Sequence, residues 1–246
     1  MNTTTENTGT GPESQEQNRT TRAKRMLLYL AIFSMVMFFA GLTSAYVVLM
    51  KGEYWVNIEV PRAFYFSTAI IVVSSITIKL AVDASKKGAQ KMVQLMLSLT
   101  LLLGLAFAAS QYQGWQQLVN KGLFVSGNIE SITGTYGEDY TVIFKGKELV
   151  KVDGDLYFPD DQQREESLNE RVLSKSNTAS SFMYTLSGLH LAHMIGGLIY
   201  LIYLVIRSYG VSFNASNNLS VKQGATYWHF LDILWVYLFL FLLFIH

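Results

Sequence analysis

The sequence predicts an all-α membrane protein, a bundle of five transmembrane helices that carries a small extracytoplasmic insert with β-structure. Three observations lead to this fold class. Half of the 246 residues are hydrophobic and only 15% are charged, whereas a soluble domain normally carries about a quarter of charged residues. The charges are almost absent from five apolar stretches, and each stretch is near or above the roughly 20 residues that a spanning helix needs. Such a chain is not an ordinary soluble enzyme.

Residues 1–25, before the first apolar stretch, are rich in Thr, Glu, Gln and Asn. They show no apolar periodicity and cannot bury enough surface to fold, so we expect a disordered cytoplasmic tail. The apolar stretch that follows is too long for a signal peptide and is not followed by a small-residue cleavage site. We therefore expect it to be retained as the first span.

The spans divide the rest of the chain into three parts. Helices are expected because backbone polar groups in lipid must be satisfied within the segment. Three spans lie within residues 26–111, an extracytoplasmic insert covers 112–177, and two spans lie within 178–246. The predicted spans are Met26–Met50, Ala63–Val82, Met92–Gln111, Ser180–Ile206 and Thr226–His246.

The distribution of basic residues predicts the orientation. The short loop between the first two spans holds only Lys51 and Arg62, and most other span-flanking Lys and Arg residues lie at the opposite ends of the spans. The positive-inside rule then places the N-terminus in the cytoplasm and, after five crossings, His246 outside. The basic residues assigned to the cytoplasmic side are Arg19, Arg22, Lys24, Arg25, Lys79, Lys86, Lys87, Lys91, Arg207 and Lys222.

The insert over residues 112–177 has its own pattern. It contains 11 acidic and 7 basic residues, a net charge of −4. Short apolar runs at Tyr140–Phe144, Leu149–Val152 and Leu156–Phe158 are separated by Lys-Gly and Asp-Gly turns, which indicates small β-hairpins. We expect a short helix within Gln162–Ser174.

Three histidines and one aspartate lie in the interior of the last two spans. His190 and His193 share one helix face, and His229 and Asp232 repeat the same spacing. An Asp inside a membrane helix costs about 2.5–3.5 kcal/mol on insertion scales, so it normally faces a partner inside the bundle. The simplest interpretation is that the fourth and fifth spans pack together and hydrogen-bond through these groups.

A ligand site is the alternative interpretation of the same residues. Imidazoles from two helices could coordinate haem or a metal, with Asp232 as a ligand or as a partner of one. A role in proton handling or in binding a lipid headgroup is also open. No other predicted span contains a His residue, which favours the structural interpretation and no metal site.

Five glycines and one acid complete the candidate residues. Small residues let membrane helices approach closely, and we expect this role for Gly41, Gly104, Gly188, Gly196 and Gly197. Glu59 precedes Val60-Pro61 at the start of the second span, where proline is well tolerated. It is either an exposed residue at the membrane interface or a functional acid.

Several function classes are excluded by what the chain lacks. Without cysteine it cannot build Fe–S clusters or thiolate zinc sites alone, and a net charge of +1 gives no basic surface for nucleic acid. The sequence contains no nucleophile–base pair, Walker loop or HExxH motif, and no inverted repeat typical of transporters. The residues therefore indicate a helical subunit that contacts other chains and lipid, with no catalytic residues of its own.

Motifs in all five spans resemble subunit III of the haem–copper terminal oxidases. Residues 227–235 (YWHFLDILW) resemble the family's YWHFvDvvW signature, and residues 187–196 (SGLHLAHMIG) resemble its GFHGLHVIIG stretch. Glu59-Val60-Pro61 followed by Ser67-Thr68 is similar to EVPLLNTS. Residues 103–111 fit LGxxFxxxQ, and residues 38–41 (FFAG) fit FFTGFF.

The resemblance implies the short five-helix bacterial form of a non-redox subunit III, from an aa3-type cytochrome c oxidase in a bacterial inner membrane. In that family, haem a and copper reside in subunits I and II. Subunit III bears no cofactor, binds phospholipid between its helices, flanks subunit I and supports proton uptake during O2 reduction. Glu59 matches the family's carbodiimide-reactive carboxylate and is the candidate proton-related residue.

The chain departs from the family pattern at three places. Met35 stands where the family has a carboxylate, and Gly114 replaces the Glu of its QxxEY motif, which puts the lipid and proton roles of those acids in doubt. The insert replaces a short loop. We expect residues 112–177 to dock an extracytoplasmic partner, either a cytochrome c domain or a neighbouring respiratory complex.

Other assignments stay open on sequence alone. The chain could be subunit III of a quinol oxidase or the accessory protein of a nitric oxide reductase, because the electron-donor site lies on other subunits. From different classes, a haem- or metal-binding membrane enzyme would use His190, His193 and His229, and a transporter would show substrate flux without partners.

Overall fold

The computed structural model describes residues 12–161, 163–164, 166–210, 212–214 and 217–245. Five helices are long and apolar enough to cross a membrane, namely Arg19–Met50, Arg62–Lys86, Gln90–Asn120, Thr178–Gly210 and Leu219–Phe244. This confirms the predicted five-span membrane fold. The chain divides into two compact units, one ending at Phe38 and the other covering Phe39–His246.

The first unit is the N-terminal part of helix α1 (Pro12–Met50). The expectation of a disordered tail over 1–25 is wrong for residues 12–25, which are helical, and residues 1–11 lie outside the described residues. Arg, Lys, Gln and Glu are good helix formers, and once the apolar span has nucleated a helix each further turn is added cheaply. Pro12 stands at the first position, where proline is tolerated.

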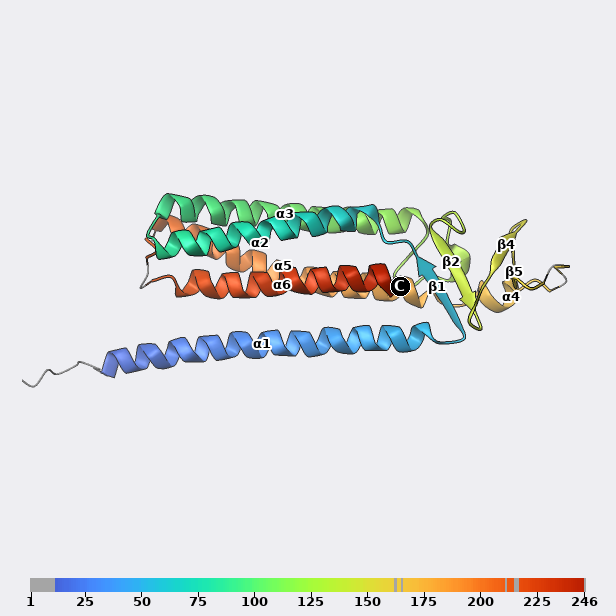
Figure 1. Ribbon diagram of the computed structural model, residues 1–246, viewed down its shortest axis with the longest axis horizontal. Coiled ribbons are helices and arrows are strands. Elements are labelled where there is room, and N and C mark those ends of the chain that lie inside the picture. The colour runs from blue at the N-terminus through green and yellow to red at the C-terminus, as the bar shows by residue number, and fades with distance from the viewer. Residues whose placement is uncertain (1–11, 162, 165, 211, 215–216, 246) are drawn as a thin grey trace, which may run out of the picture. The chain divides into compact units, whose positions relative to one another are not determined.

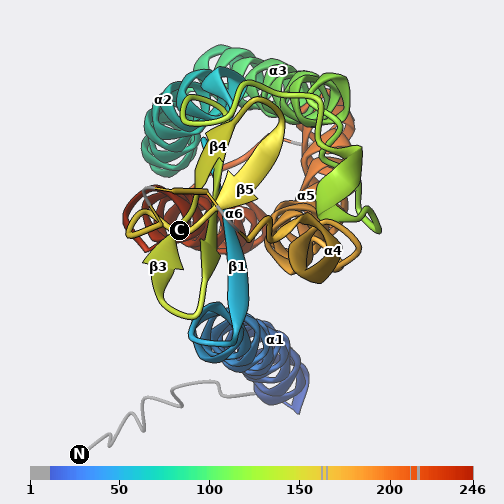
Figure 2. The same cartoon turned by 90° about the vertical axis from the view of Figure 1, so that its right-hand side faces the viewer.

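The second unit is built around a ring of four helices (Figures 1 and 2): α2 (Arg62–Lys86), α3 (Gln90–Asn120), α5 (Thr178–Gly210) and α6 (Leu219–Phe244). Each helix contacts two others, in the order α2, α3, α5, α6 and back to α2. The last turns of α1 also belong to this unit. There the Thr43 hydroxyl lies 3.0 Å from the Tyr237 hydroxyl of α6.

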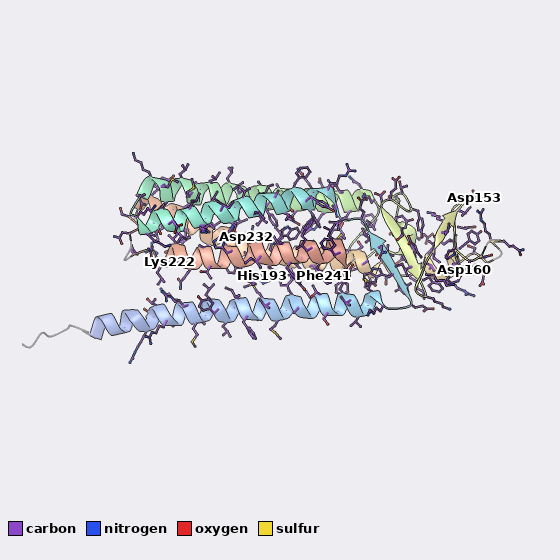
Figure 3. All side chains as sticks on the ribbon, in the orientation of Figure 1. Asp153, Asp160, His193, Lys222, Asp232 and Phe241 are labelled. Atoms are coloured by element: carbon purple, nitrogen blue, oxygen red, sulfur yellow. The ribbon has the colours of Figure 1, made fainter. Side chains whose placement is uncertain are left out.

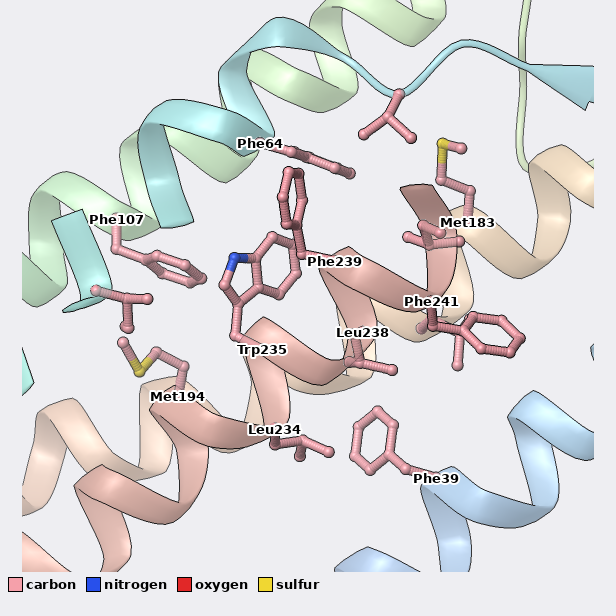
Figure 4. Packing of buried hydrophobic residues seen from close by; sticks show 14 of the residues in the cluster. Phe39, Phe64, Phe107, Met183, Met194, Leu234, Trp235, Leu238, Phe239 and Phe241 are labelled. Carbon is pink, nitrogen blue, oxygen red and sulfur yellow. The ribbon is translucent and has the colours of Figure 1, made fainter. Parts of the chain in front are cut away.

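Aromatic side chains fill the interior of this ring (Figure 4). The Trp235 indole lies between two phenylalanines, with its ring centre 5.4 Å from that of Phe64 and 5.3 Å from that of Phe107, both edge-on. At one end of the ring, Tyr46 packs edge-on against Trp55 and Phe241. Edge-to-face packing of this kind adds about 0.5–1.5 kcal/mol per pair beyond the burial of apolar area.

Helix α3 is longer than the predicted third span. It continues to Asn120, nine residues past the expected end at Gln111, so the insert begins near Lys121 and not at residue 112. The additional turns are amphipathic, with Gly114 and Leu118 buried against the ring. The helix ends at Asn120, with Lys121 as its C-cap, and the chain turns away at Gly122, whose positive φ of 73° suits a residue without a Cβ.

The insert contributes to a sheet that its sequence pattern does not predict. Strand β2 (Tyr140–Phe144) is one of the predicted strands. It pairs antiparallel with β1 (Tyr54–Ile58), from the loop between the first two spans, and with the two-residue strand β3 (Lys147–Glu148). The β1–β2 register places Val56 opposite Val142. The insert is therefore hydrogen-bonded to a loop that lies far from it in sequence.

A second hairpin and a short helix complete the insert. Strands β4 (Val150–Val152) and β5 (Asp155–Tyr157) pair across Asp153-Gly154, both with positive φ, as an Asp-Gly hairpin turn requires. Of the helix expected within Gln162–Ser174, only α4 (Asn169–Val172) is helical among the described residues.

Candidate functional site

Glu59 lies at the end of the ring that carries the insert, between strand β1 and helix α2. Its backbone N–H donates to the Asp139 carbonyl at 2.9 Å, which extends the β1–β2 ladder by one residue. Its side chain is 57% exposed, and the carboxylate lies 4.0 Å from the Lys121 ammonium. Glu59 thus sits at the surface where the helices meet the insert and not in the apolar interior.

Lys121 makes its closer contact with Asp139. The Lys121 ammonium lies 2.7 Å from the Asp139 carboxylate, and the Thr135 backbone N–H donates to the same carboxylate at 2.7 Å. The hydrogen bond from Lys121 lowers the pKa of the Asp139 carboxyl below its ordinary value, and the Thr135 hydrogen bond adds to this effect. A cavity of about 440 Å³ borders this group, lined by Glu59, Val60, Arg62, Gln117, Asn120, Lys121, Glu138 and Asp139.

His229 and Asp232 of α6 face helix α2. The His229 Nδ1 atom lies 2.7 Å from the Ser75 hydroxyl and 4.0 Å from the Asp232 carboxylate. The Asp232 side chain is only 6% exposed, and neither of its oxygens has a hydrogen-bond partner among the described residues. Figure 3 shows Asp232 along the length of the helices, whereas Asp153 and Asp160 lie in the insert.

His190 and His193 of α5 have different surroundings. His190 is fully buried, with its ring 5.1 Å from Trp235 and 5.8 Å from Phe107, and both ring nitrogens are without a partner in the described part of the chain. The His193 Nδ1 atom lies 2.7 Å from the Leu189 carbonyl of its own helix. The His193 carbonyl accepts a hydrogen bond from the Tyr227 hydroxyl at 3.1 Å.

The proposed network of hydrogen bonds between the fourth and fifth spans therefore needs correction. Helices α5 and α6 do pack together, but His229 bonds to α2 and His190 packs against aromatic rings. Hydrogen bonds between α5 and α6 come instead from Tyr227, Tyr200 and Arg207, none of which was a candidate for this role. The pairing depends on how each helix is rotated about its axis, and residue spacing within one helix does not define that rotation.

Tryptophan N–H groups make several of the hydrogen bonds between helices that the sequence pattern did not predict. Each of three indoles donates to a hydroxyl on a neighbouring helix: Trp115 to Ser187 at 3.0 Å, Trp228 to Ser74 at 2.7 Å and Trp235 to Thr68 at 3.0 Å. Such bonds in membrane bundles contribute about 0.6 kcal/mol each on average and about 1.7 kcal/mol at most. The Ser and Thr residues within the apolar spans were the available signal.

The candidate glycines fall into two groups. A Cβ at Gly104 would lie 2.8 Å from the Leu198 and Trp228 side chains, and a Cβ at Gly197 would lie 3.2 Å from Leu231. By contrast, a Cβ would meet only looser contacts at Gly188 and Gly196, and no described atom within 4 Å at Gly41. Two glycines that were not candidates are also tightly packed, Gly114 against Phe64 and Gly224 against Leu204 and Tyr200.

The arrangement offers polar contacts between helices but no set of ligands for a metal. Among the described residues, no three His, Asp or Glu side chains come together in a way that could hold an ion. His190, His193 and His229 are engaged separately, with aromatic rings, a backbone carbonyl and a serine hydroxyl respectively. Chemically, the site can join helices and present a carboxyl group inside the bundle.

Comparisons with known proteins agree with the motifs. The family model described as "Cytochrome c oxidase subunit III" matches residues 148–246. A probable cytochrome c oxidase subunit 3 of Nocardia farcinica is 27% identical over 216 residues, which cover 84% of this chain and 80% of the relative. A cytochrome c oxidase subunit 3 of Bacillus sp. strain PS3 is 23% identical over 236 residues, which cover 94% of this chain and 90% of the relative. A cytochrome bo(3) ubiquinol oxidase subunit 3 of Pseudomonas aeruginosa is 27% identical over 172 residues, which cover 70% of this chain and 59% of the relative.

Proposed function

Because the chain belongs to the subunit III family of haem–copper oxidases, we propose that it is the non-redox subunit III of an aa3-type cytochrome c oxidase. In this role it supports subunit I within the aerobic respiratory chain and helps to sustain proton uptake. Family motifs in order along all five spans, together with relatives that match over most of the chain, carry the proposal. Haem a and copper would belong to subunits I and II, and this chain would bind phospholipid.

The use of the intramembrane polar groups supports a structural role. Three tryptophans and Tyr227 form hydrogen bonds between helices, and glycines at tight contacts let the helices approach. Groups used in this way position helices against one another, which is what a supporting subunit requires.

A quinol oxidase is the second candidate assembly. The Pseudomonas aeruginosa relative is a subunit of a ubiquinol oxidase, and the electron-donor site would lie on other subunits in either case. The haem type of the purified complex and its activity with cytochrome c or with quinol distinguish the two.

Affinity purification of the chain in mild detergent tests the proposal. We expect two larger chains to co-purify, with the haem a spectrum and the copper belonging to the complex. Recovery of the chain without haem-containing partners would contradict the proposal, and so would stoichiometric haem on the chain alone.

We propose that the protein lies in the bacterial inner membrane with its N-terminus in the cytoplasm and its C-terminus in the periplasm. The distribution of Lys and Arg supports this orientation. Labelling of single cysteines introduced at Lys222 and at Asp153 by a membrane-impermeant reagent tests it in intact cells. Only the variant at Asp153 should react.

Glu59 stays our candidate for a proton-related acid, although its surroundings favour an electrostatic role near the insert. It is exposed and close to Lys121, and the proposed orientation puts it at the extracytoplasmic end. Glu59→Gln should assemble normally and lose oxidase activity sooner during turnover. Activity that decays at the parent rate would remove Glu59 from the functional residues.

We also propose that the insert docks a basic extracytoplasmic partner, such as a cytochrome c domain, or a neighbouring respiratory complex. The net charge of −4 over residues 112–177 supports this, as do Glu148, Asp153 and Asp160, which are exposed on and beside its strands. Opposite charges on two partners increase the rate of association and make it sensitive to salt.

A further inference from the structure

The carboxyl group of Asp232 is buried, and the described residues offer it one neighbouring donor, the Ser75 hydroxyl, which also lies 2.7 Å from the His229 Nδ1 atom. Its side chain is 6% exposed, and both oxygens are without a partner among the described residues. The neighbouring imidazole is 4.0 Å away, and its Nδ1 atom lies closer to the Ser75 hydroxyl. Leaving a carboxyl group with at most one shared donor in an apolar environment is costly, so a further donor from a neighbouring chain would stabilise it.

The depth of Asp232 in the membrane limits what that donor can be. Asp232 is the fourteenth of the 26 residues of α6, which places it about 20 Å from either end of the helix. Lipid headgroups lie at the membrane surface, and acyl chains carry no donor. A polar side chain on another transmembrane helix can reach this depth.

The surface next to Asp232 has the composition of a helix-docking site. The side chain of His229 is 35% exposed, and it contacts the partly exposed Ser75 of α2. Large apolar side chains surround this polar centre and are about half or more exposed. We call this surface the α2–α6 face and define it by Val72, Ser75 and Ile76 of α2 and His229, Asp232 and Ile233 of α6.

A different face of the ring has no such polar centre. Leu102 of α3 and Ile199 of α5 are both 64% exposed, and their neighbours along each helix, Leu95, Leu105, Ile195 and Ile202, are also exposed and apolar. A purely apolar face is satisfied by lipid chains. The contrast marks the α2–α6 face as the one that a protein partner would stabilise.

We propose that the α2–α6 face is the surface on which the oxidase core docks, and that a transmembrane helix of the core places a hydrogen-bond donor against Asp232 and His229. This inference rests on the proposed function, because it takes the partner to be a haem-containing oxidase subunit. It adds the face, the depth and the polar group through which the two chains meet.

Site-specific photo-crosslinking in the complete complex tests this inference. A photoreactive amino acid replaces Val72 or Ile233 on the α2–α6 face, and Leu102 or Ile199 as matched controls on the apolar face. We expect crosslinks to an oxidase core subunit from Val72 and Ile233, and crosslinks to lipid alone from Leu102 and Ile199.

The possible outcomes separate this inference from the proposed function. Lipid crosslinks alone at Val72 and Ile233, in a preparation that still contains the haem-bearing core, would overturn the inference and leave the proposed function intact. Crosslinks to the core from the control positions alone would do the same. A preparation without the core would overturn the proposed function instead.

Substitution of Asp232 gives a second measurement. Asp232→Leu should reduce the amount of core retained after a detergent wash by about threefold or more, the effect of one lost hydrogen bond between membrane helices. Asp232→Asn keeps a polar group at the same place and should lose less. Equal retention by the parent and both variants would contradict a hydrogen bond from the core to Asp232.

Discussion

The ring of helices and the insert use polar groups in opposite ways. In the ring, Trp228 and Ser74 are buried and hydrogen-bonded across helices. In the insert, the Lys147–Asp160 ion pair joins side chains that are 53% and 70% exposed, and exposed pairs of this kind contribute little. The comparison shows that polar contacts inside the ring hold the fold together, whereas the charges of the insert are available to another molecule.

Substitution of tightly packed glycines in the ring should have the largest effect. Gly104→Ala places a Cβ 2.8 Å from Trp228, and Gly114→Ala places one against the buried Phe64. Overpacking of this kind costs about 1–3 kcal/mol. The midpoint of thermal unfolding in detergent should fall for both variants.

Gly41→Ala is the matched control, because its Cβ would meet no described atom within 4 Å. Its midpoint should stay near that of the parent protein. An equal fall of the midpoint in all three variants would indicate a general effect of alanine. It would contradict the assignment of the effect to close packing of the helices at Gly104 and Gly114.

Loss of one buried hydrogen bond should have the next largest effect. Trp228→Phe and Ser74→Ala each remove the 2.7 Å bond between α6 and α2, at a cost of about 0.6–1.7 kcal/mol for the bond itself. A double-mutant cycle measured by unfolding isolates this contribution, because the double variant loses the same bond only once. Strictly additive losses would show that the bond contributes nothing.

Loss of the Asp139 carboxylate, where the insert meets the helices, should have the third largest effect, and this effect should depend on pH. The lowered pKa of Asp139 means that its contribution is present above about pH 4, the ordinary value for Asp, and is lost as the pH falls through the lower folded value. Asp139→Asn should speed hydrogen exchange at the Thr135 amide at pH 7, with a cost of about 1 kcal/mol or less.

The difference between the Asp139→Asn variant and the parent should disappear in acid, where the parent carboxyl is also neutral. Exchange at the Leu149 amide, which donates to the Val142 carbonyl of β2 at 2.8 Å, provides an internal reference. A difference that is equally large at every pH would contradict the assignment to the charge of Asp139.

The smallest effect on stability should come from the exposed acids of the insert. Glu148→Gln combined with Asp153→Asn should change the free energy of unfolding by less than about 0.5 kcal/mol. The same variant should bind a basic cytochrome c domain more slowly at low salt. Unchanged association would contradict docking through the insert and leave the stability comparison intact.

The sequence predicted the parts of the fold that depend on local pattern. Five apolar stretches define five spans, and the Lys-Gly and Asp-Gly turns define the hairpins at β2 and at β4–β5. Strand β2 is followed by a Lys-Gly turn that marks a hairpin, whereas β1 has no such turn to its partner, because the two strands lie more than eighty positions apart. Helix ends were misplaced at Pro12 and Asn120, where polar residues with good helix propensity continue an apolar helix.

The sequence identified most residues of the candidate site, but it did not predict which residues contact one another. The spans identified His229, Asp232 and the glycines as unusual, but the helix rotations decide that His229 meets Ser75 and that Gly104 meets Trp228. The sequence pattern indicated only that Gly114 replaces a glutamate of the family motif. The structure shows that Gly114 packs against Phe64, which leaves no room for a side chain at this position.

The pairing of β1 with β2 has a consequence for biosynthesis. At ordinary rates of translation, β2 leaves the ribosome roughly ten seconds after β1. During that interval the apolar strand that contains Trp55 and Ile58 has an open edge and no partner. A chaperone that covers this edge, or rapid insertion of α2 and α3, would protect the nascent chain, and mutations that delay β2 would raise its degradation before any oxidase is assembled.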